Sequence, residues 1–294
     1  MPFAQCDGKR ERDRQMENYS VLLLVYKGEE PANFREAIQS MLDQTVLTDD
    51  FVIVCDGPLT GELDGVIADF EAKYPGLFQI LRLPQNVGVG LANRAGLELC
   101  RNELVAKMDS DDIALPDRCR LQLERFAQKP ELAVLGGYIE EFDNATGKPF
   151  AIRAVPVEED AVRTYARRRN PINNVTAMYR KSAAMAVGSY PDLRRGEDYD
   201  LYLRMLMKGY RIENMPRTLV RVRVDADSHR RRTSWAALKG CAGIWWNAYR
   251  EGYSSAWDLM VCLVGQMVLI LCPARVQQML YLHLLRKKCD TKDE

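Results

Sequence analysis

Four apolar runs alternate with helical segments in the first 110 residues of this chain, and this alternation limits the folds that it can adopt. The runs cover residues 19–25, 51–55, 78–83 and 104–108, and the first, YSVLLLV, is nearly uninterrupted, as in a strand buried on both faces. We expect helices over the intervening segments 31–43, 63–74 and 88–100. Strands and helices that alternate with short connections predict an α/β fold with a mostly parallel sheet.

The pattern changes after Pro116. There the sequence predicts a helix over 116–128, a strand over 132–143, a turn over 144–149, a helix near 158–169, a strand over 176–179, a helix over 197–208 and a strand over 218–224. Because no repeat or low-complexity linker interrupts these elements, we expect one domain over residues 18–232. A polar, charged leader over 1–17 is predicted to be disordered, and residues 233–294 are predicted to be a helical extension.

The extension contains a run from Ala256 to Cys272 that is apolar on nearly all sides. Its uncharged part, residues 259–272, is 14 residues long, whereas a spanning helix needs about 20. Residues 274–288 form a second predicted helix, amphipathic and basic at its end. Two interpretations stay open: a helical hairpin packed on the domain, or a segment lying on the anionic inner face of the cytoplasmic membrane. The Arg- and Lys-rich stretch over 204–232 suits the second, although it also suits solvated faces.

Composition excludes some other classes of protein. Lys and Arg number 41 and Asp and Glu number 41, so the net charge of zero argues against nucleic acid as a partner. Eight scattered cysteines without a C-x-x-C pair, together with only two histidines, argue against a structural zinc site. Scattered cysteines in a chain of this size indicate a reduced, cytoplasmic protein.

Three carboxylates follow the predicted strand 104–108, at Asp109, Asp111 and Asp112. Ligands of open α/β sheets bind beside such strand ends. Residues i and i+2 of an extended chain point the same way, so Asp109 and Asp111 can face one ligand. Their repulsion and their oxygen chemistry predict a Mn²⁺ or Mg²⁺ site that bridges to substrate phosphates; the alternative is a solvated turn.

Three further motifs lie at element ends. Asp56-Gly57 ends the second strand, Asn86-Val-Gly88-Val-Gly90 opens a helix where a phosphate could approach the backbone, and Glu197-Asp198 opens another helix. Each alone is also compatible with an ordinary turn or with the acids that favour helix N-termini. Their occurrence together in one domain favours a binding site.

In order and spacing, these motifs resemble the family 2 glycosyltransferases of the GT-A fold, most of all the bacterial members that build capsule, O-antigen and other exopolysaccharides. The likeness extends over about residues 19–232 and includes Phe34–Ser40, Gln44-Thr45 and Asn170–Asn173. It implies a Rossmann-like, mostly parallel sheet flanked by helices. It also implies inverting, metal-dependent transfer of a hexose, namely galactose, glucose or an N-acetylhexosamine, from a UDP-sugar to a lipid-diphosphate-linked saccharide.

The resemblance also implies a role for each motif. Nucleotide and donor contacts are expected from Val25, Tyr26, Glu29, Asp56, Asn86, Gly88, Asp109 and Ser110. Asp109 and Asp111 would hold Mn²⁺ or Mg²⁺, and His229 is a candidate third ligand, with a surface histidine as the alternative. Asp198, paired with Glu197, is the expected general base, because inversion needs one carboxylate to take the proton of the acceptor hydroxyl. Two other classes stay open, a sugar-phosphate nucleotidyltransferase and a non-catalytic nucleotide-sugar-binding subunit.

Overall fold

A computed structural model describes residues 17–224, 235–272 and 287–288 of the chain. Within them, one sheet contains β1 (Tyr19–Val25), β2 (Asp50–Cys55), β3 (Phe78–Arg82), β4 (Leu104–Asp109), β5 (Ile113–Ala114), β6 (Leu132–Asp143), β7 (Pro149–Arg153), β8 (Met178–Arg180), β9 (Arg211–Val224) and β10 (Lys287–Lys288). The strand order is β10-β7-β6-β8-β4-β1-β2-β3, and β9 pairs with β5 and β6. The pairs β1–β2, β1–β4, β2–β3 and β6–β9 are parallel, which confirms the predicted architecture.

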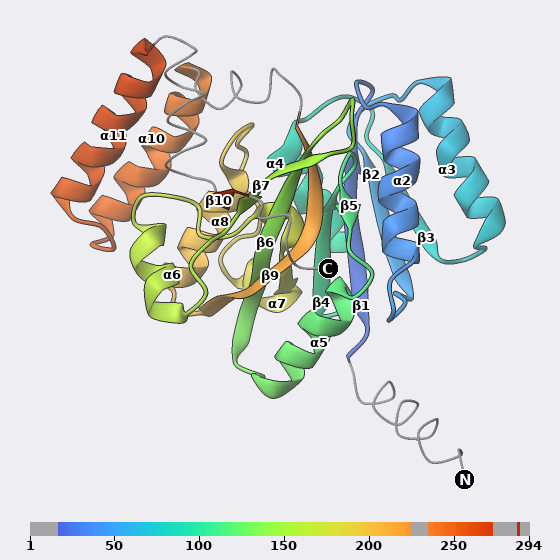
Figure 1. Cartoon of the computed structure of the whole chain (residues 1–294), viewed down its shortest axis with the longest axis horizontal. Coiled ribbons are helices and arrows are strands. Elements are labelled where there is room, and N and C mark those ends of the chain that lie inside the picture. Colours follow the sequence, from blue (N-terminus) through green and yellow to red (C-terminus); the bar gives the residue numbers. More distant parts are fainter. Residues whose placement is uncertain (1–16, 225–234, 273–286, 289–294) are drawn as a thin grey trace.

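Helices cover both faces of this sheet (Figure 1). They are α2 (Pro31–Leu42), α3 (Gly61–Lys73), α4 (Val89–Leu99), α5 (Arg118–Gln128), α6 (Glu159–Ala166), α7 (Lys181–Ala186), α8 (Glu197–Met207), α10 (Trp235–Arg250) and α11 (Ala256–Leu271), with a 3-10 turn at Asn174–Thr176. On one face α2, α3 and α5 bury their apolar residues, and on the other α4, α6, α7, α8 and α10 do so.

Both faces of β1 are buried, which explains the apolar sequence of residues 19–25. Val21, Leu23 and Val25 belong to the core beneath α2 and α3, whereas Leu22 belongs to the core beneath α4 and α8. Because alternate residues enter two different cores, most positions on this strand favour an apolar side chain. The exception is Ser20, which is buried and donates a hydrogen bond to Asp50. Within β1 most side chains are enclosed by the two cores, so a ligand can be contacted mainly by residues at or after its carboxyl end.

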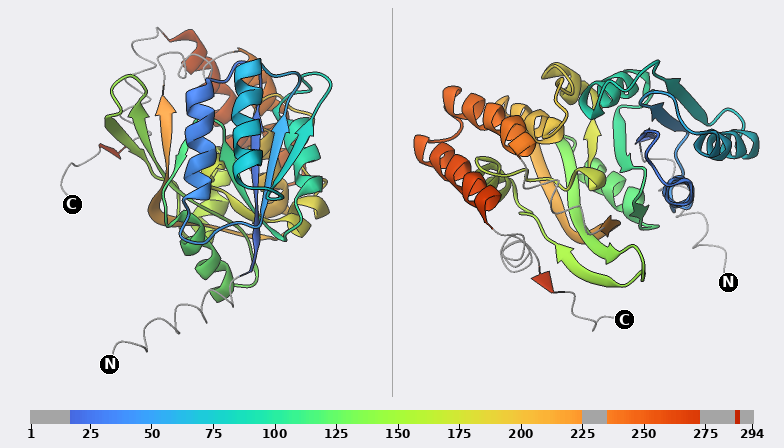
Figure 2. Two further views of the ribbon diagram at one scale, coloured as in Figure 1. Left: turned by 90° about the vertical axis from the view of Figure 1, so that its right-hand side faces the viewer. Right: turned by 90° about the horizontal axis from the view of Figure 1, so that it is seen from above.

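The C-terminal hairpin of α10 and α11 lies at the opposite end of the molecule from α3 (Figures 1 and 2). α11 begins at a capping box between Ser255 and Asp258, and no helix in the described ranges is long and apolar enough to cross a membrane. Lys287 and Lys288 form β10 on the edge of β7, not the end of the helix expected over 274–288. The leader over 1–16 and the tail over 273–286 lie outside the described residues.

Candidate active site

A cavity of about 830 Å³ lies beside the carboxyl ends of β1, β2 and β4 and is lined by residues from four predicted motifs. It is within the range that small-molecule sites occupy. The predicted residues that line it are Tyr26, Glu29, Asp56, Asn86, Gly88, Asp109, Ser110, Asp111 and Glu197. The structure therefore brings together strand-end and helix-start motifs that are up to 171 positions apart in sequence.

Asp56 organises one side of the cavity. Its carboxylate accepts hydrogen bonds from the backbone N–H of Val87 at 2.7 Å and of Gly88 at 3.1 Å, and from the side-chain amide of Asn86 at 2.8 Å. Gly57 has φ +91°, and a Cβ there would lie 2.8 Å from the backbone nitrogen of Asn86. The segment from Asn86 to Gly88 is thus fixed to the end of β2 before it enters α4.

The strand-end carboxylates form a negative cluster on the cavity wall. Lys107 Nζ, itself buried, donates to Asp109 Oδ1 at 3.1 Å, and the Ser110 hydroxyl donates to Glu29 at 2.6 Å. Burial, followed by the charges of Asp109 and Glu29, raises the pKa of Asp111 to about 7. A divalent cation would remove that repulsion.

Asp112, the third acid of the same motif, has a different role. It is buried, and its carboxylate accepts a hydrogen bond from the backbone N–H of Arg223 at 2.9 Å. The Arg223 guanidinium donates to the carbonyl oxygen of Asp111 at 2.6 Å. Asp112 therefore ties the motif to β9 and is not part of the cavity wall.

The acid pair lies at the start of α8. Glu197 lines the cavity, and burial together with the charge of Asp198 raises its pKa to about 8. Asp198 does not line the cavity; it accepts a hydrogen bond from the side-chain amide of Asn170 at 2.7 Å. Burial also raises the pKa of Asp198. The pKa of about 8 lets the Glu197 carboxyl exchange a proton at physiological pH.

Arg194 is a cavity residue that the motif search missed. Its Cγ would lie 3.4 Å from a Cβ built on Gly88, and within the described chain it forms no ion pair. The other two cationic side chains of the cavity wall form ion pairs, Lys107 with Asp109 and Arg223 with Glu36. The signal was present as Arg194-Arg195, directly before the Gly196-Glu197-Asp198 motif.

Several expectations have a different outcome. The Val25 side chain is fully buried in the core, because β1 turns that position towards α2 and α3, so it does not line the cavity. His229 lies outside the described residues. The basic stretch over 204–224 is largely neutralised by ion pairs, which join Arg204 to Asp200, Arg211 to Glu131, Arg221 to Glu140 and Arg223 to Glu36.

The residues that remain for a metal are Asp109 and Asp111. Within the described ranges no group of three His, Cys, Asp or Glu side chains is arranged as a metal site. Two carboxylates are nevertheless a sufficient protein contribution for Mg²⁺ or Mn²⁺, because such ions usually complete their shell with substrate phosphates and water. The raised pKa of Asp111 fits this use, since burial and then the charges of Asp109 and Glu29 disfavour its ionised form, which a bound cation would favour.

Comparison with known proteins agrees with this geometry. The model of the family "Glycosyl transferase family 2" matches residues 20–193. The chain is 34% identical to the amylovoran biosynthesis glycosyltransferase AmsE of Erwinia amylovora over 75% of this chain and 82% of that protein. It is 29% identical to the UDP-Gal:alpha-D-GlcNAc-diphosphoundecaprenol beta-1,3-galactosyltransferase of Escherichia coli over 92% of this chain and 97% of that one.

The fold is also shared with a solved structure, the mannosyltransferase PcManGT from Pyrobaculum calidifontis in complex with GDP-Man and Mn²⁺. The TM-score is 0.62 at 14% identity, over 94% of this chain and 85% of that one. The family match, which covers more than half of the chain, decides between the three classes that the sequence left open. The chain belongs to glycosyl transferase family 2 and is a glycosyltransferase of the GT-A fold.

Proposed function

We propose that this chain transfers a hexose, namely galactose, glucose or an N-acetylhexosamine, from a UDP-sugar to a lipid-diphosphate-linked saccharide, with inversion, in the synthesis of a surface polysaccharide. The observation that carries the proposal is one cavity that joins the Asp56 loop, the Asp109–Asp111 carboxylates and Glu197. The galactosyltransferase of Escherichia coli supports the substrate class, since its name gives UDP-Gal as donor and a diphosphoundecaprenol-linked sugar as acceptor.

The donor half of the cavity is built from the parallel strands. Tyr26 and the loop Asn86–Gly88, which Asp56 fixes, provide the surface for the nucleoside, and a free carboxylate lone pair of Asp56 remains for the uracil. Asp109 and Asp111 would hold Mn²⁺ or Mg²⁺ against the diphosphate. When bound, the ion neutralises charge that develops on the leaving UDP. Arg194, without an ion-pair partner in the described chain, offers a second positive charge to the same phosphates.

The acid pair belongs to the acceptor side. The acceptor hydroxyl attacks the anomeric carbon, the bond from that carbon to the diphosphate oxygen breaks, and the hydroxyl proton passes to a carboxylate. We assign the proton to the acid pair, in which Glu197 lines the cavity and Asp198, the next residue of α8, is the base that the resemblance implies. Asn170 holds the Asp198 carboxylate in place through its 2.7 Å hydrogen bond. A single displacement with one base inverts the anomeric centre and needs no covalent intermediate.

The test is UDP release from UDP-Gal, UDP-Glc, UDP-GlcNAc and UDP-GalNAc, with a synthetic GlcNAc-diphosphate lipid as acceptor. Each donor is assayed with Mn²⁺, with Mg²⁺ and with EDTA, and the product linkage is read by NMR. The proposal expects one preferred donor, dependence on a divalent ion and a product of inverted configuration. Retained configuration, or full activity in EDTA, would contradict it.

We further propose that the protein is peripheral, on the cytoplasmic face of an anionic membrane. α11 exposes Trp257, Met260, Val264, Val268 and Leu271, with Trp257 62% and Leu271 77% accessible. These positions recur at helical spacing on one side of α11, and α10 exposes Trp246 and Tyr249. An apolar face with aromatic residues is typical of helices that lie in the bilayer interface.

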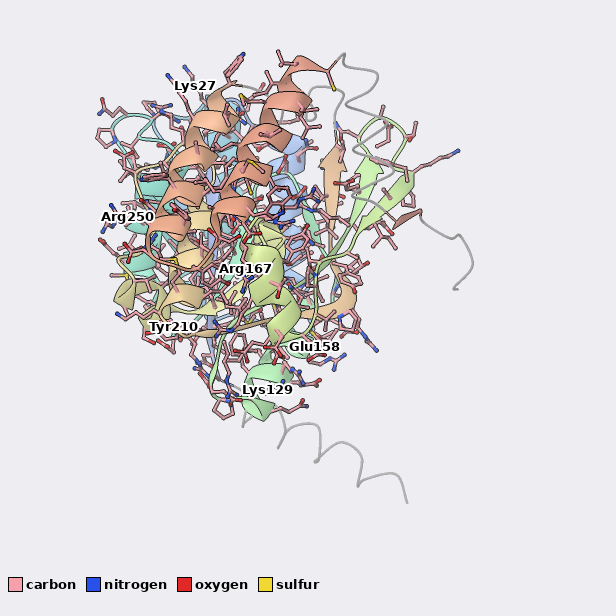
Figure 3. All side chains as sticks on the ribbon, turned by 90° about the vertical axis from the view of Figure 1, so that its left-hand side faces the viewer. Lys27, Lys129, Glu158, Arg167, Tyr210 and Arg250 are labelled. Carbon is pink, nitrogen blue, oxygen red and sulfur yellow. The ribbon has the colours of Figure 1, made fainter. Side chains whose placement is uncertain are left out.

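Cationic side chains also lie near the hairpin, since the charge of Arg167 acts on Tyr253 and that of Arg169 on Cys262. Arg167, just after the end of α6, is exposed beside the hairpin (Figure 3). Arg169 and, on α10, Lys239 are also exposed. Each such charge near an anionic surface contributes about 1 kcal/mol. Vesicle flotation of the full chain tests the idea with the double substitution Trp257→Ser and Val264→Ser. Leu47→Ser is the control, because Leu47 is 69% exposed outside the hairpin. Equal flotation of all three proteins would refute this surface.

A further inference from the structure

The end of α6 contacts the C-terminal hairpin at three points. We call residues 163–170 the bridging segment. The Tyr253 hydroxyl, between α10 and α11, donates to the carbonyl oxygen of Arg163 at 2.9 Å. Arg168 Nε donates to Asp258 of α11 at 2.6 Å, and Cys262 Sγ donates to the carbonyl oxygen of Arg168 at 3.6 Å. Asp258 is buried, whereas the Arg168 side chain is 45% exposed, so the ion pair lies at the edge of the contact with its carboxylate inside.

The same segment also contacts the first turn of α8, which carries the acid pair. The Tyr199 hydroxyl donates to the carbonyl oxygen of Ala166 at 2.7 Å. The Asn170 amide donates to Asp198 Oδ2 at 2.7 Å. The bridging segment therefore bonds to two successive residues of α8, Asp198 and Tyr199. The hairpin bonds to the same segment.

A second contact reaches the acid pair from α10. Gly240 packs against the backbone of Arg195, and a Cβ on Gly240 would lie 2.9 Å from the Arg195 carbonyl oxygen. Gly196, with φ +76°, is the N-cap of α8, and a Cβ there would lie 2.9 Å from Cδ1 of Ile244. α10 therefore lies directly on the two residues that precede Glu197.

We propose that the C-terminal hairpin is a positioning element of the active site, which holds Glu197 and Asp198 through the bridging segment and through the Gly240–Arg195 contact. The proposal rests on the proposed function, in which this acid pair acts on the acceptor. Arg168 and Gly240 are positioning residues and touch no reacting atom. A displacement of a catalytic group by about 1 Å can lower a rate about 100-fold, so contacts of this kind affect turnover even where they contribute little to stability.

Two glycines on α10 provide a matched test. Gly240→Ala forces the Arg195 backbone or the helix to move, whereas Gly243→Ala adds the same methyl group to the same helix at a position with no atom within 4 Å. We expect Gly240→Ala to lower kcat for the GlcNAc-diphosphate lipid by about 10- to 100-fold, with the Kd for UDP within twofold of the parent. Gly243→Ala should leave both values unchanged.

The ion pair gives an independent test. Arg168→Gln should lower kcat in the same way at unchanged UDP affinity, and Arg168→Lys should restore most of it by keeping the charge opposite Asp258. The control is Arg250→Gln, which removes an exposed ion pair to Glu251 at the end of α10. Wild-type turnover in Arg168→Gln and in Gly240→Ala would overturn the inference.

Hydrogen–deuterium exchange separates this proposal from the proposed function, because it needs no substrate. In Arg168→Gln and Gly240→Ala, amides in the first turn of α8 should exchange at least about tenfold faster than in the parent, with β1 and β4 unchanged. If the parent transfers no sugar, this exchange result alone decides the inference. Unchanged exchange at α8 in both variants would reject the inference. If one variant exchanges faster over the whole sheet, its fold is destabilised generally, and the result for the other variant decides.

Discussion

Replacing Asp56 by Asn should destabilise the fold as well as weaken nucleotide binding. The carboxylate accepts three hydrogen bonds from the segment Asn86–Gly88, one at Oδ1 and two at Oδ2. An asparagine has one acceptor oxygen, so in either orientation its NH₂ group meets at least one N–H donor. An unsatisfied buried donor costs about 1–3 kcal/mol, and bonds to a neutral oxygen are weaker than bonds to a charged one.

The expected loss is therefore about 2–4 kcal/mol in the free energy of unfolding. For a domain of this size each kcal/mol lowers Tm by about 2–4 °C, so Tm should fall by about 4–16 °C. The assay is thermal unfolding followed by circular dichroism, with the Kd for UDP measured by calorimetry. The control is Asp64→Asn, because Asp64 forms one exposed ion pair, with Arg82, which contributes at most about 1 kcal/mol.

Two outcomes would refute this reasoning. An unchanged Tm in Asp56→Asn would mean that the three hydrogen bonds do not hold the loop. Weaker UDP binding at an unchanged Tm would assign the carboxylate to the uridine alone.

Three further predictions follow from other acids. Asp111→Asn should abolish Mn²⁺-dependent UDP binding. It should leave Tm unchanged or higher, because it removes a carboxylate that is buried beside other acids. Calorimetry with and without Mn²⁺ tests this, and an unchanged Mn²⁺ dependence would show that Asp111 does not bind the metal. Asp198→Asn should lower kcat at least about 100-fold with donor affinity retained; a collapse of donor affinity instead would make it a binding residue. For Glu213, burial alone would raise the pKa, but hydrogen bonds from Lys129 and Arg125 outweigh it and lower the pKa. Its contribution is thus present above the unfolded carboxyl pKa and lost as pH falls through the folded one. Urea unfolding of Glu213→Gln should show a loss of about 1–2 kcal/mol at pH 7, because both cations are partly exposed, and little difference near pH 3; an equal loss at both pH values would contradict the assignment.

The elements that the sequence predicted well are those whose burial is uniform. β1, β2 and β4 are enclosed on both faces, so most of their residues are apolar. The buried polar exceptions are Ser20, Asp50 and Lys107, and each is hydrogen-bonded. β9 was predicted only from 218, but it begins at Arg211. Its pairing with β6 shifts register between Met215 and Thr218, and this irregularity admits Pro216 and hides the strand pattern.

Elements that depend on tertiary contacts were missed. β5 and α7 have two and six residues, too few for a periodic signal, and β7 is a five-residue strand of mixed polarity between β10 and β6. α10 lies within the predicted helical extension, but its bounds were not predicted, because Gly240 and Gly243 weaken helix propensity. At the site, the sequence placed Asp109 at a strand end, which is where β4 ends, and the roles of the acids stay predictions. Which acids share the cavity wall depends on partners such as Arg223 and Asn170 that lie far along the chain.

Arg223 sets a limit on how glycosyltransferases of this kind can be recombined. Its backbone and guanidinium bond to Asp112, to the carbonyl oxygen of Asp111, to Asn144 and to Glu36. One residue of β9 thus joins the parallel half of the sheet, the β6–β7 turn and α2. A chimera that exchanged everything after Asp112 for the corresponding part of a relative would place a foreign β9 against the native carboxylate motif. The two halves of the chain therefore cannot be exchanged independently. A chimera preserves the cavity only if Arg223 and the residues that bond to it come from the same parent protein.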